Sequence, residues 1–186
     1  MASRACIGFP NYAEVEVCLS EMTNGILSSI NFIISGHNDD TCDDCQGFHD
    51  VNGLKNADNQ EIYQILEKYL HQGEKFSLTD YIDIKNILKT TCKTPFQEDV
   101  ISSLLNTDYG DLVSYETLAA QSGHPGAARA VGNVMRRNRF SIIIPCHRVV
   151  AKRGIGGFGG NNHPIFTGIK KKLQEIEKRI KEKYEI

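Results

Sequence analysis

Residues 114–138, "SYETLAAQSGHPGAARAVGNVMRRN", have the pattern of two short helices joined by a turn. Ser114 is a typical N-cap for the first helix, and Gly123 is a typical residue to end it. Helical spacing of apolar residues resumes at Gly126. The pattern predicts a helix-turn-helix, but many ordinary helical pairs share this shape, so it does not by itself establish nucleic-acid binding.

The second of these helices is predicted to have two unlike faces. At 100° per residue, one face should pack inward and carries Ala127, Val131, Val134 and Met135. The opposite face carries Gly126, Arg129, Gly132, Asn133 and Arg136. Small residues allow close approach and arginines attract phosphates, so this face suits a sugar–phosphate surface. The alternative is that glycine and alanine only permit tight helix packing.

Charge is distributed unevenly along the chain, although the net charge is only −2. Residues 1–99 hold 16 acidic and 7 basic side chains, whereas residues 100–186 hold 7 acidic and 14 basic ones. From Thr117 to Gln174 there is no Asp or Glu, while ten Lys and Arg occur. This favours a polyanionic partner such as nucleic acid, with a solvated basic face as the alternative.

The composition shift near residue 90 predicts two lobes. In the first lobe, residues 25–35 predict a strand, residues 58–70 a helix with an Asp58–Glu61 capping box, and residues 76–84 a strand or extended link. In the second, Thr94, Pro95 and Gln97 predict a capped helix start. Residues 140–145, "FSIIIP", predict a strand that ends at Pro145. Residues 169–184 predict a last helix with an apolar stripe of Ile169, Leu173, Ile176 and Ile180, and Glu177 at its edge.

The composition excludes a transmembrane helix and argues against a secreted protein. Hydrophobic residues make up 40%, no run of eighteen apolar residues exists, and the first residues lack the apolar region of a secretory signal. We therefore expect an intracellular protein, nuclear in a eukaryote and cytoplasmic in a prokaryote. Its six cysteines should be thiols or metal ligands. Cys42 and Cys45 have zinc-ligand spacing that Cys6, Cys18, His37 and His49 could complete, but one CxxC is a weak signal and unlinked loop cysteines are the alternative.

The stretch "IPCHRVV" places Cys146 directly before His147. The thiol could be a packed core group, a metal ligand or a nucleophile with His147 as its base. A turn after Pro145 would bring the two side chains together, and Arg148 adds positive charge nearby. Most such pairs in an apolar setting are buried thiols, so the residues alone leave the three readings open.

Five motifs occur in one order between residues 94 and 180: "TPFQEDV", "GDLVSYETLA", "AARAVGNVMRRN", "IPCHRVV" and "GIKKKLQEIE". Together they resemble the O6-alkylguanine-DNA alkyltransferase family of direct-reversal DNA repair proteins. The resemblance implies an α+β protein of two lobes. Residues 1–90 would form an N-terminal ribonuclease-H-like α/β lobe, and residues 91–186 a helical, winged-helix-like lobe that binds DNA and carries the chemistry.

The resemblance also implies roles for individual residues. Cys146 would accept the alkyl group, His147 would act as its base through a water, Glu177 would orient His147, and Asn138 would lie near the active-site turn. Tyr115 would contact the target phosphate and donate a hydrogen bond in the pocket. Arg129 would enter the base stack from a minor-groove surface that includes Ala127, Ala128, Gly132 and Arg136. The guanine pocket would be lined by Met135, Val149, Phe158, Gly159 and Gly160.

The implied activity is a one-turnover transfer of alkyl groups from O6 of guanine, and O4 of thymine, in double-stranded DNA to Cys146 after nucleotide flipping. The expected protein is a monomer that needs no cofactor, with a structural zinc in the first lobe as a less favoured option. Phe158 stands where the family often has Tyr, and the 154–168 loop is longer than usual. A damage sensor would lack the acceptor thiol, and a Cys–His hydrolase would leave Arg129 unexplained.

Overall fold

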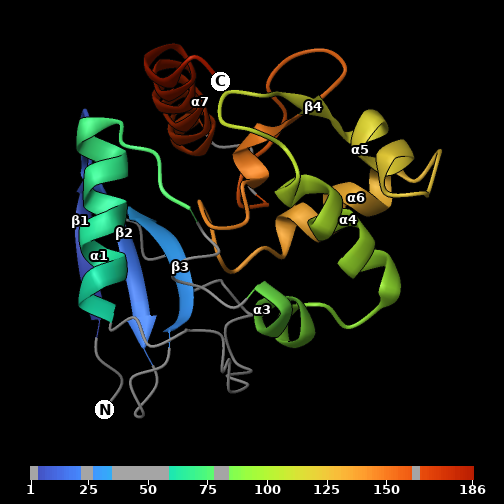
Figure 1. The fold of residues 1–186 in the computed structure, drawn as a ribbon, viewed down its shortest axis with the longest axis horizontal. Helices are drawn as coiled ribbons and strands as arrows, with labels where there is room; N and C mark the ends of the chain where they lie inside the picture. The colour runs from blue at the N-terminus through green and yellow to red at the C-terminus, as the bar shows by residue number, and fades with distance from the viewer. Residues whose placement is uncertain (1–3, 22–26, 35–58, 78–83, 161–163) are drawn as a thin grey trace. The chain divides into compact units, whose positions relative to one another are not determined.

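The computed structural model describes residues 4–21, 27–34, 59–77, 84–160 and 164–186 of the 186-residue chain. The chain divides into two compact units, one of residues 1–72 and 76–91 and the other of residues 73–75 and 92–186. The fold is mixed, with most helices in the second unit and a small sheet in the first (Figure 1).

The first unit contains an antiparallel sheet of three strands in the order β1–β2–β3. They are β1 (Arg4–Phe9), β2 (Tyr12–Glu21) and β3 (Leu27–Ile34). Alternate residues of these strands are buried, among them Ile7, Phe9, Val15, Val17 and Ile30. Helix α1 (Asn59–Glu67) continues as a π-helical turn, η2 (Lys68–Gln72), and α3 (Ile84–Thr91) completes the unit.

The predicted strand and helix of this unit are confirmed as β3 and α1, whereas β1, β2 and α3 were not predicted. Residues 78–83 of the expected extended link and the helix cap at Asp58 lie outside the described residues. The same holds for four of the zinc candidates, His37, Cys42, Cys45 and His49. The Cα atoms of Cys6 and Cys18 are direct partners across β1 and β2.

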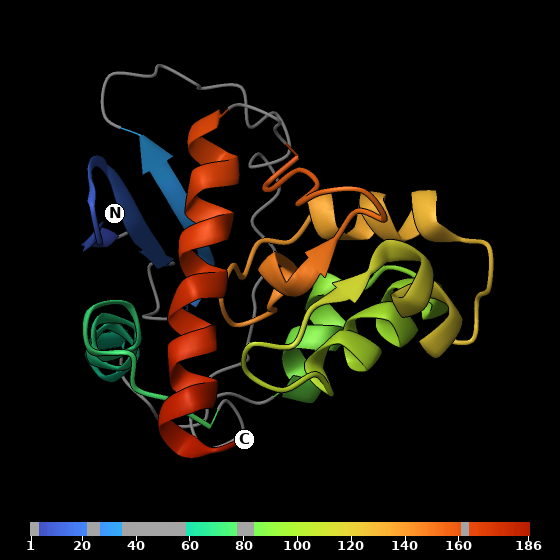
Figure 2. The same ribbon diagram turned by 90° about the horizontal axis from the view of Figure 1, so that it is seen from above.

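The second unit holds α4 (Pro95–Leu105), β4 (Val113–Ser114), α5 (Tyr115–Gln121), α6 (Ala128–Arg136), the 3₁₀ turn η3 (Cys146–Arg148), β5 (Val149–Val150) and α7 (Pro164–Tyr184). Helices α4, α5 and α6 pack against one another (Figure 2). The two short strands pair in parallel, with Val113 opposite Val149 and Ser114 opposite Val150. This pairing joins the start of α5 to the residues that follow η3.

The helix starts follow the predicted capping chemistry with one difference. Thr94 Oγ1 accepts from the Gln97 amide at 3.3 Å, and Ser114 Oγ accepts from the Thr117 amide at 2.9 Å. The Gln97 side chain accepts from the amide of Lys93 at 2.6 Å, one residue before the cap that a capping box would use. The two helices predicted to start after Thr94 and after Ser114 are confirmed as α4 and α5.

The predicted strand at residues 140–145 is wrong. The amide of Ile144 donates to Phe140 O at 2.8 Å and Ile142 has a φ of 75°. Residues 140–145 form isolated bridges, such as the one between Ser141 and Ile144, but no strand. All of residues 140–144 are buried. A short apolar run indicates burial but does not distinguish a strand from a buried turn, which explains the error.

The last helix begins at Pro164, five residues before the predicted start. Proline fits the first position of a helix because its missing N–H has no intrahelical partner there. The predicted stripe of Ile169, Leu173, Ile176 and Ile180 is completely buried. No helix among the described residues is long and apolar enough to cross a membrane.

Candidate active site

Cys146 lies at the first position of η3 and is 6% exposed. Its Sγ accepts a hydrogen bond from Asn138 Nδ2 at 3.1 Å. The same amide group donates to Ile144 O at 2.9 Å, and Asn138 Oδ1 accepts from the amide of Phe140 at 2.9 Å. Asn138 therefore holds the buried turn closed and fixes the position of the sulfur.

The environment of the thiol has opposing effects on its ionisation. Burial raises the pKa of Cys146, whereas the hydrogen bond from Asn138 and the charge of Lys170 lower it, and burial is the larger effect. A thiol in this setting keeps its proton until a base takes it. Reaction at Cys146 thus requires a proton acceptor close to the site.

Lys170 is a buried residue of the site that was not predicted. Its side chain is completely buried on α7, and Nζ donates to Val149 O at 2.5 Å and to Gly157 O at 3.0 Å. Burial lowers the pKa of Lys170 to about 8. Lysines 170–172 are consecutive, and the sequence alone does not show which of them is buried. The spacing of seven residues to Glu177, two helical turns along the same face, was the available signal.

His147 is completely buried, and its Nε2 lies 2.8 Å from Oε1 of Glu177. Neither ring nitrogen makes a hydrogen bond of standard geometry among the described residues, so the Nε2–Glu177 contact is a close ion pair, and Nδ1 has no polar contact at all. Gln174 Nε2 donates to the His147 carbonyl at 2.8 Å, which ties η3 to α7. The sequence placed Glu177 at the edge of the apolar stripe, but the residue is only 1% exposed.

Arg148 makes a two-pronged contact with the same carboxylate. Its Nε donates to Glu177 Oε2 and its Nη2 to Oε1, both at 2.8 Å. The amide of Gly110 also donates to Oε2 at 3.1 Å. Burial opposes the charged carboxylate, but His147 and Arg148 outweigh it and lower the pKa of Glu177 to about 2. The sequence analysis interpreted Arg148 only as a positive charge near the thiol.

A cavity of about 140 Å³ opens beside the sulfur. It is lined by Tyr115, Gly132, Met135, Arg136, Cys146 and the loop residues 157–160. Of the predicted pocket residues, Met135, Phe158, Gly159 and Gly160 line this cavity. The prediction for Val149 differs from the structure, because Val149 does not line the cavity and its carbonyl accepts from Lys170 instead.

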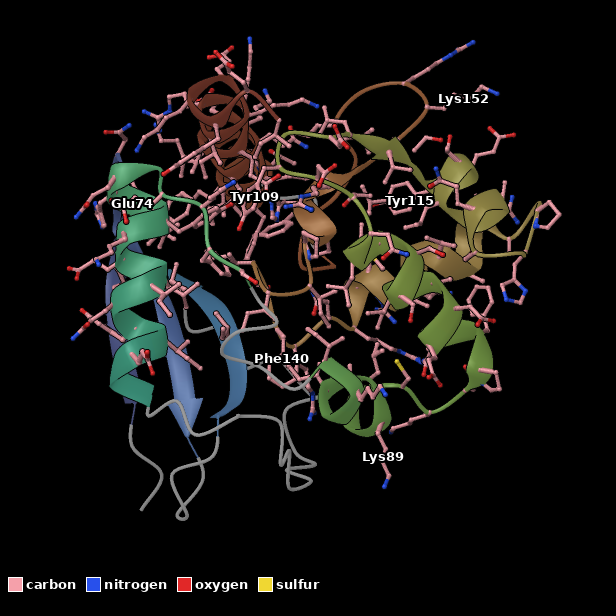
Figure 3. The ribbon with its side chains drawn as sticks, in the orientation of Figure 1. Glu74, Lys89, Tyr109, Tyr115, Phe140 and Lys152 are labelled. Atoms are coloured by element: carbon pink, nitrogen blue, oxygen red, sulfur yellow. The ribbon has the colours of Figure 1, made fainter. Side chains whose placement is uncertain are left out.

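Two glycines let the pocket loop pack closely. A Cβ on Gly156 would lie 3.3 Å from Cε2 of Tyr115, and one on Gly160 would lie 2.4 Å from Cγ of Arg136. Both have positive φ, +73° and +74°. Burial and the charge of Cys146 raise the pKa of Tyr115, so its hydroxyl stays protonated as a donor at the cavity. Figure 3 labels Tyr115 at the start of α5.

The two faces of α6 differ largely as predicted, although Gly132, expected on the exposed face, is half-buried. Val131, Val134 and Met135 are buried, while Arg129 and Arg136 are exposed, and Ala127, just before the helix, is half-buried. Neither arginine makes a hydrogen bond or ion pair with any described residue. The turn before α6 is held to α4, because His124 Nε2 lies 2.9 Å from Asp99 Oδ2 and its ring contacts Phe96.

No group of three or more metal-ligating side chains occurs among the described residues.

The geometry defines a class of site, a buried cysteine with a histidine–carboxylate pair beside a helix-turn-helix. Residues 95–179 match the protein family described as "6-O-methylguanine DNA methyltransferase, DNA binding domain". This match confirms, for residues 95–179, the resemblance seen in the sequence.

Curated relatives agree over the same region. The chain is 46% identical over 88 residues to the methylated-DNA–protein-cysteine methyltransferase of Mycobacterium leprae, a match that covers 47% of this chain and 50% of the relative. It is 44% identical over 94 residues to the protein of that name from Salmonella typhimurium, covering 47% and 55%. The chain is 46% identical over 72 residues to the Cricetulus griseus protein of that name, a match that covers 38% of this chain and 34% of the relative. The matches thus span about half or less of the relatives' length.

Solved structures extend the likeness to the whole fold. The Mycobacterium tuberculosis O6-methylguanine methyltransferase has a TM-score of 0.66 and 25% identity, over 96% of this chain and 94% of that one. A methyltransferase from the archaeon Pyrococcus kodakaraensis has a TM-score of 0.55 and 22% identity, over 95% and 99%, which supports the fold alone.

Proposed function

We propose that this chain repairs DNA directly, by transferring an alkyl group from O6 of guanine, or O4 of thymine, in double-stranded DNA to Cys146. The observation that carries the proposal is the position of the Cys146 sulfur in the wall of a cavity that also reaches Gly132 and Arg136 of α6. A reactive atom and a helix suited to DNA thus share one site. The family match over residues 95–179 supports the same activity.

The two units would be the two lobes of this repair protein. Residues 91–186 would form the winged-helix-like alkyltransferase domain, and residues 1–90 a ribonuclease-H-like lobe. The likeness to the Mycobacterium tuberculosis enzyme over 96% of the chain supports this assignment. The protein would act as a monomer and without a cofactor, because each step below uses only side chains of one chain.

DNA would bind along the exposed face of α6 in the minor groove. Ala127, Ala128 and Gly132 allow the backbone of the helix to approach the sugars, and Arg129 fills the space that the flipped base leaves. Extruding the nucleotide costs a few kcal/mol, which is less for a mispaired alkylated base. Arg136 and Tyr115, both in the cavity wall, would contact the target nucleotide.

The chemical step is a displacement at the alkyl carbon. The proton of Cys146 passes to His147, which acts through a water, and the bond from Sγ to carbon forms as the bond from carbon to O6 breaks. The electron pair leaves with guanine, which Tyr115 stabilises by donating a hydrogen bond. Lys170 favours the thiolate by its charge. The product is a thioether, and since a thiolate is a poor leaving group from an unactivated carbon, each molecule reacts once.

The test is an intact-mass measurement with excess O6-methylguanine duplex. We expect the mass of one methyl group on Cys146, and repaired DNA equal in amount to the protein. Cys146→Ser should bind the duplex without gaining mass. Cys92→Ser is the matched control, because Cys92 is the other described free thiol and burial raises its pKa to about 11. Repair beyond one equivalent would indicate a hydrolase, and binding without mass gain a damage sensor.

A further inference from the structure

Three segments that are distant in the sequence meet at Arg148. The side chain starts on η3, and its Nη1 donates to Thr107 O and to Thr107 Oγ1 at 3.0 Å. Its Nε and Nη2 donate to Glu177 on α7. The ring of Tyr109, which Figure 3 labels, lies 5.1 Å from the guanidinium carbon. The guanidinium is thus held on the turn after α4 and reaches across to the last helix.

Both oxygens of Glu177 are fully engaged as a result. Oε1 lies 2.8 Å from His147 Nε2 and accepts from Arg148 Nη2, while Oε2 accepts from Arg148 Nε and from the amide of Gly110. Charged hydrogen bonds of this two-pronged kind fix the plane of a carboxylate as well as its position. Rotation of the Glu177 carboxylate would break at least two of them.

We propose that Arg148 is the positioning residue of the alkyl-transfer site, which acts through Glu177 to fix the proton of His147 on Nε2. This rests on the proposed function. If the ring hydrogen is on Nε2, where the Glu177 carboxylate lies 2.8 Å away, the lone pair lies on Nδ1, which has no described polar atom within reach. His147 can then accept the Cys146 proton at Nδ1. In the other tautomer Nδ1 carries a hydrogen and cannot accept.

The carboxylate itself does not take the proton from His147. The pKa of Glu177 is lowered to about 2, so the group stays charged and only accepts hydrogen bonds. A lysine at position 148 would keep the charge but would not reproduce the fork, because an ammonium is a point charge without fixed donor directions. The proposal therefore requires arginine, and not only a positive charge.

The backbone of the turn after α4 supports this arrangement. Gly110 has a φ of +75°, and a Cβ there would lie 3.2 Å from both Glu177 O and Lys181 Cβ. Only glycine brings its amide to the carboxylate without moving α7. Asp111 forms an ion pair with Lys181 at 2.6 Å, which binds the same turn to the same helix one turn further on.

The experiment compares the wild-type chain with Arg148→Met, Arg148→Lys and the control Lys178→Met. Lys178 is also a cation, on α7, but it is exposed, and its one ion-pair partner among the described residues is Glu182, at 3.9 Å. Two quantities are measured on each full-length protein: the ¹⁵N chemical shifts of the His147 ring, which report its tautomer, and the rate of methyl transfer from a duplex.

We expect the Nε2–H tautomer in the wild-type and Lys178→Met proteins, with equal rates. Arg148→Met should show a mixture of tautomers and a rate about 10- to 100-fold lower, the range found when a group that orients a metal-binding histidine is removed. The tautomer mixture and the rate of Arg148→Lys should lie between those of the wild-type protein and those of Arg148→Met. A folded Arg148→Met protein with the wild-type ring shifts and rate would overturn the proposal.

Loss of the buried cation removes the main charge partner of Glu177 and leaves it only His147 and the Gly110 amide, so Arg148→Met can fail to fold. In that case Arg148→Lys decides, because wild-type ring shifts and rate in this variant would equally overturn the requirement for the fork. A wild-type chain that gains no methyl group would contradict the proposed function alone, since the ring shifts would still report whether Arg148 sets the tautomer.

Discussion

Two sets of charged residues in the second unit, one buried on η3 and α7 and the other on α6, differ in their surroundings. Arg148, Lys170 and Glu177 are buried, and each has hydrogen-bond partners within the chain. Arg129 and Arg136 on α6 are exposed and have none among the described residues. The charged groups of the first set make contacts within the protein and hold its atoms in place. The charges of the second set are available to a binding partner.

This difference separates the effects that mutations should have. A change in the buried set should alter stability and the chemical step together, since those residues hold the fold and orient the reacting groups. A change on α6 should leave stability nearly intact and act only when DNA is present. Each of the following predictions tests one side of that contrast.

The largest expected effect is that of Glu177→Gln. The variant leaves Arg148 buried without its anion, which typically costs about 3–5 kcal/mol of unfolding free energy. Methyl transfer should fall about 100-fold or more, because His147 loses its orienting carboxylate. Urea unfolding at neutral pH and single-turnover kinetics measure the two effects. Glu175→Gln is the matched control on the same helix, because this exposed carboxylate pairs with Lys172 at 3.8 Å and is expected to contribute less than about 1 kcal/mol.

Acid should destabilise the protein through the same residue. The pKa of Glu177 falls from 4.5 to about 2 on folding, so its contribution is complete above about 4.5 and is lost as the pH falls towards 2. The loss amounts to about 3 kcal/mol, from 1.36 kcal/mol for each pH unit. Unfolding free energies measured across this range should show a steeper acid slope for wild type than for Glu177→Gln. Equal slopes would contradict the assignment.

Arg129→Ala should act only on duplex DNA. Without the side chain that fills the base stack, transfer from a duplex lesion is expected to fall about 10- to 100-fold, equivalent to about 1.4–2.8 kcal/mol of flipping cost. Reaction with free O6-benzylguanine, which needs no flipping, should be unchanged. Arg179→Ala removes a charge from the exposed side of α7 and serves as the control. An equal loss with the free base would place Arg129 in the chemical step instead.

The smallest expected effect is that of Gly160→Ala. Its Cβ would displace the Arg136 stem, and the positive φ adds strain of about 1 kcal/mol. We expect a small loss of stability and a several-fold slower transfer from duplex, with little change for the free base. Gly123→Ala is the control, since it has a similar φ of +82° but open space around it. Equal effects of the two variants on transfer would show that only backbone strain matters.

Much of the second unit could be predicted because local signals agreed with the tertiary structure. Ser114 and Thr94 mark helix starts by their own hydrogen bonds, and α6 divides into faces by simple helical periodicity. The Cys146–His147 pair was visible as a dipeptide, and its link to Glu177 came from the family resemblance.

The parts that were missed depend on contacts between distant residues. Nothing near Arg148 in the sequence indicates Thr107 or Gly110, and nothing in "IKKKL" indicates that Lys170 points to the carbonyls of Val149 and Gly157. The buried turn at residues 140–145 has the composition of a strand, and only its position next to Asn138 decides its form. Pairing over long sequence separations has no local pattern.

Helix α7 sets the distance between two parts of the site. Lys170 and Glu177 are seven residues apart on it, about 10.5 Å along its axis at 1.5 Å per residue. Lys170, at one end of that interval, binds the carbonyls of Val149 and Gly157, and Glu177, at the other end, contacts the imidazole of His147. An insertion of a single residue between them would rotate one end by about 100° against the other, so the length of this segment is as strict a requirement as the identity of the residues at its ends.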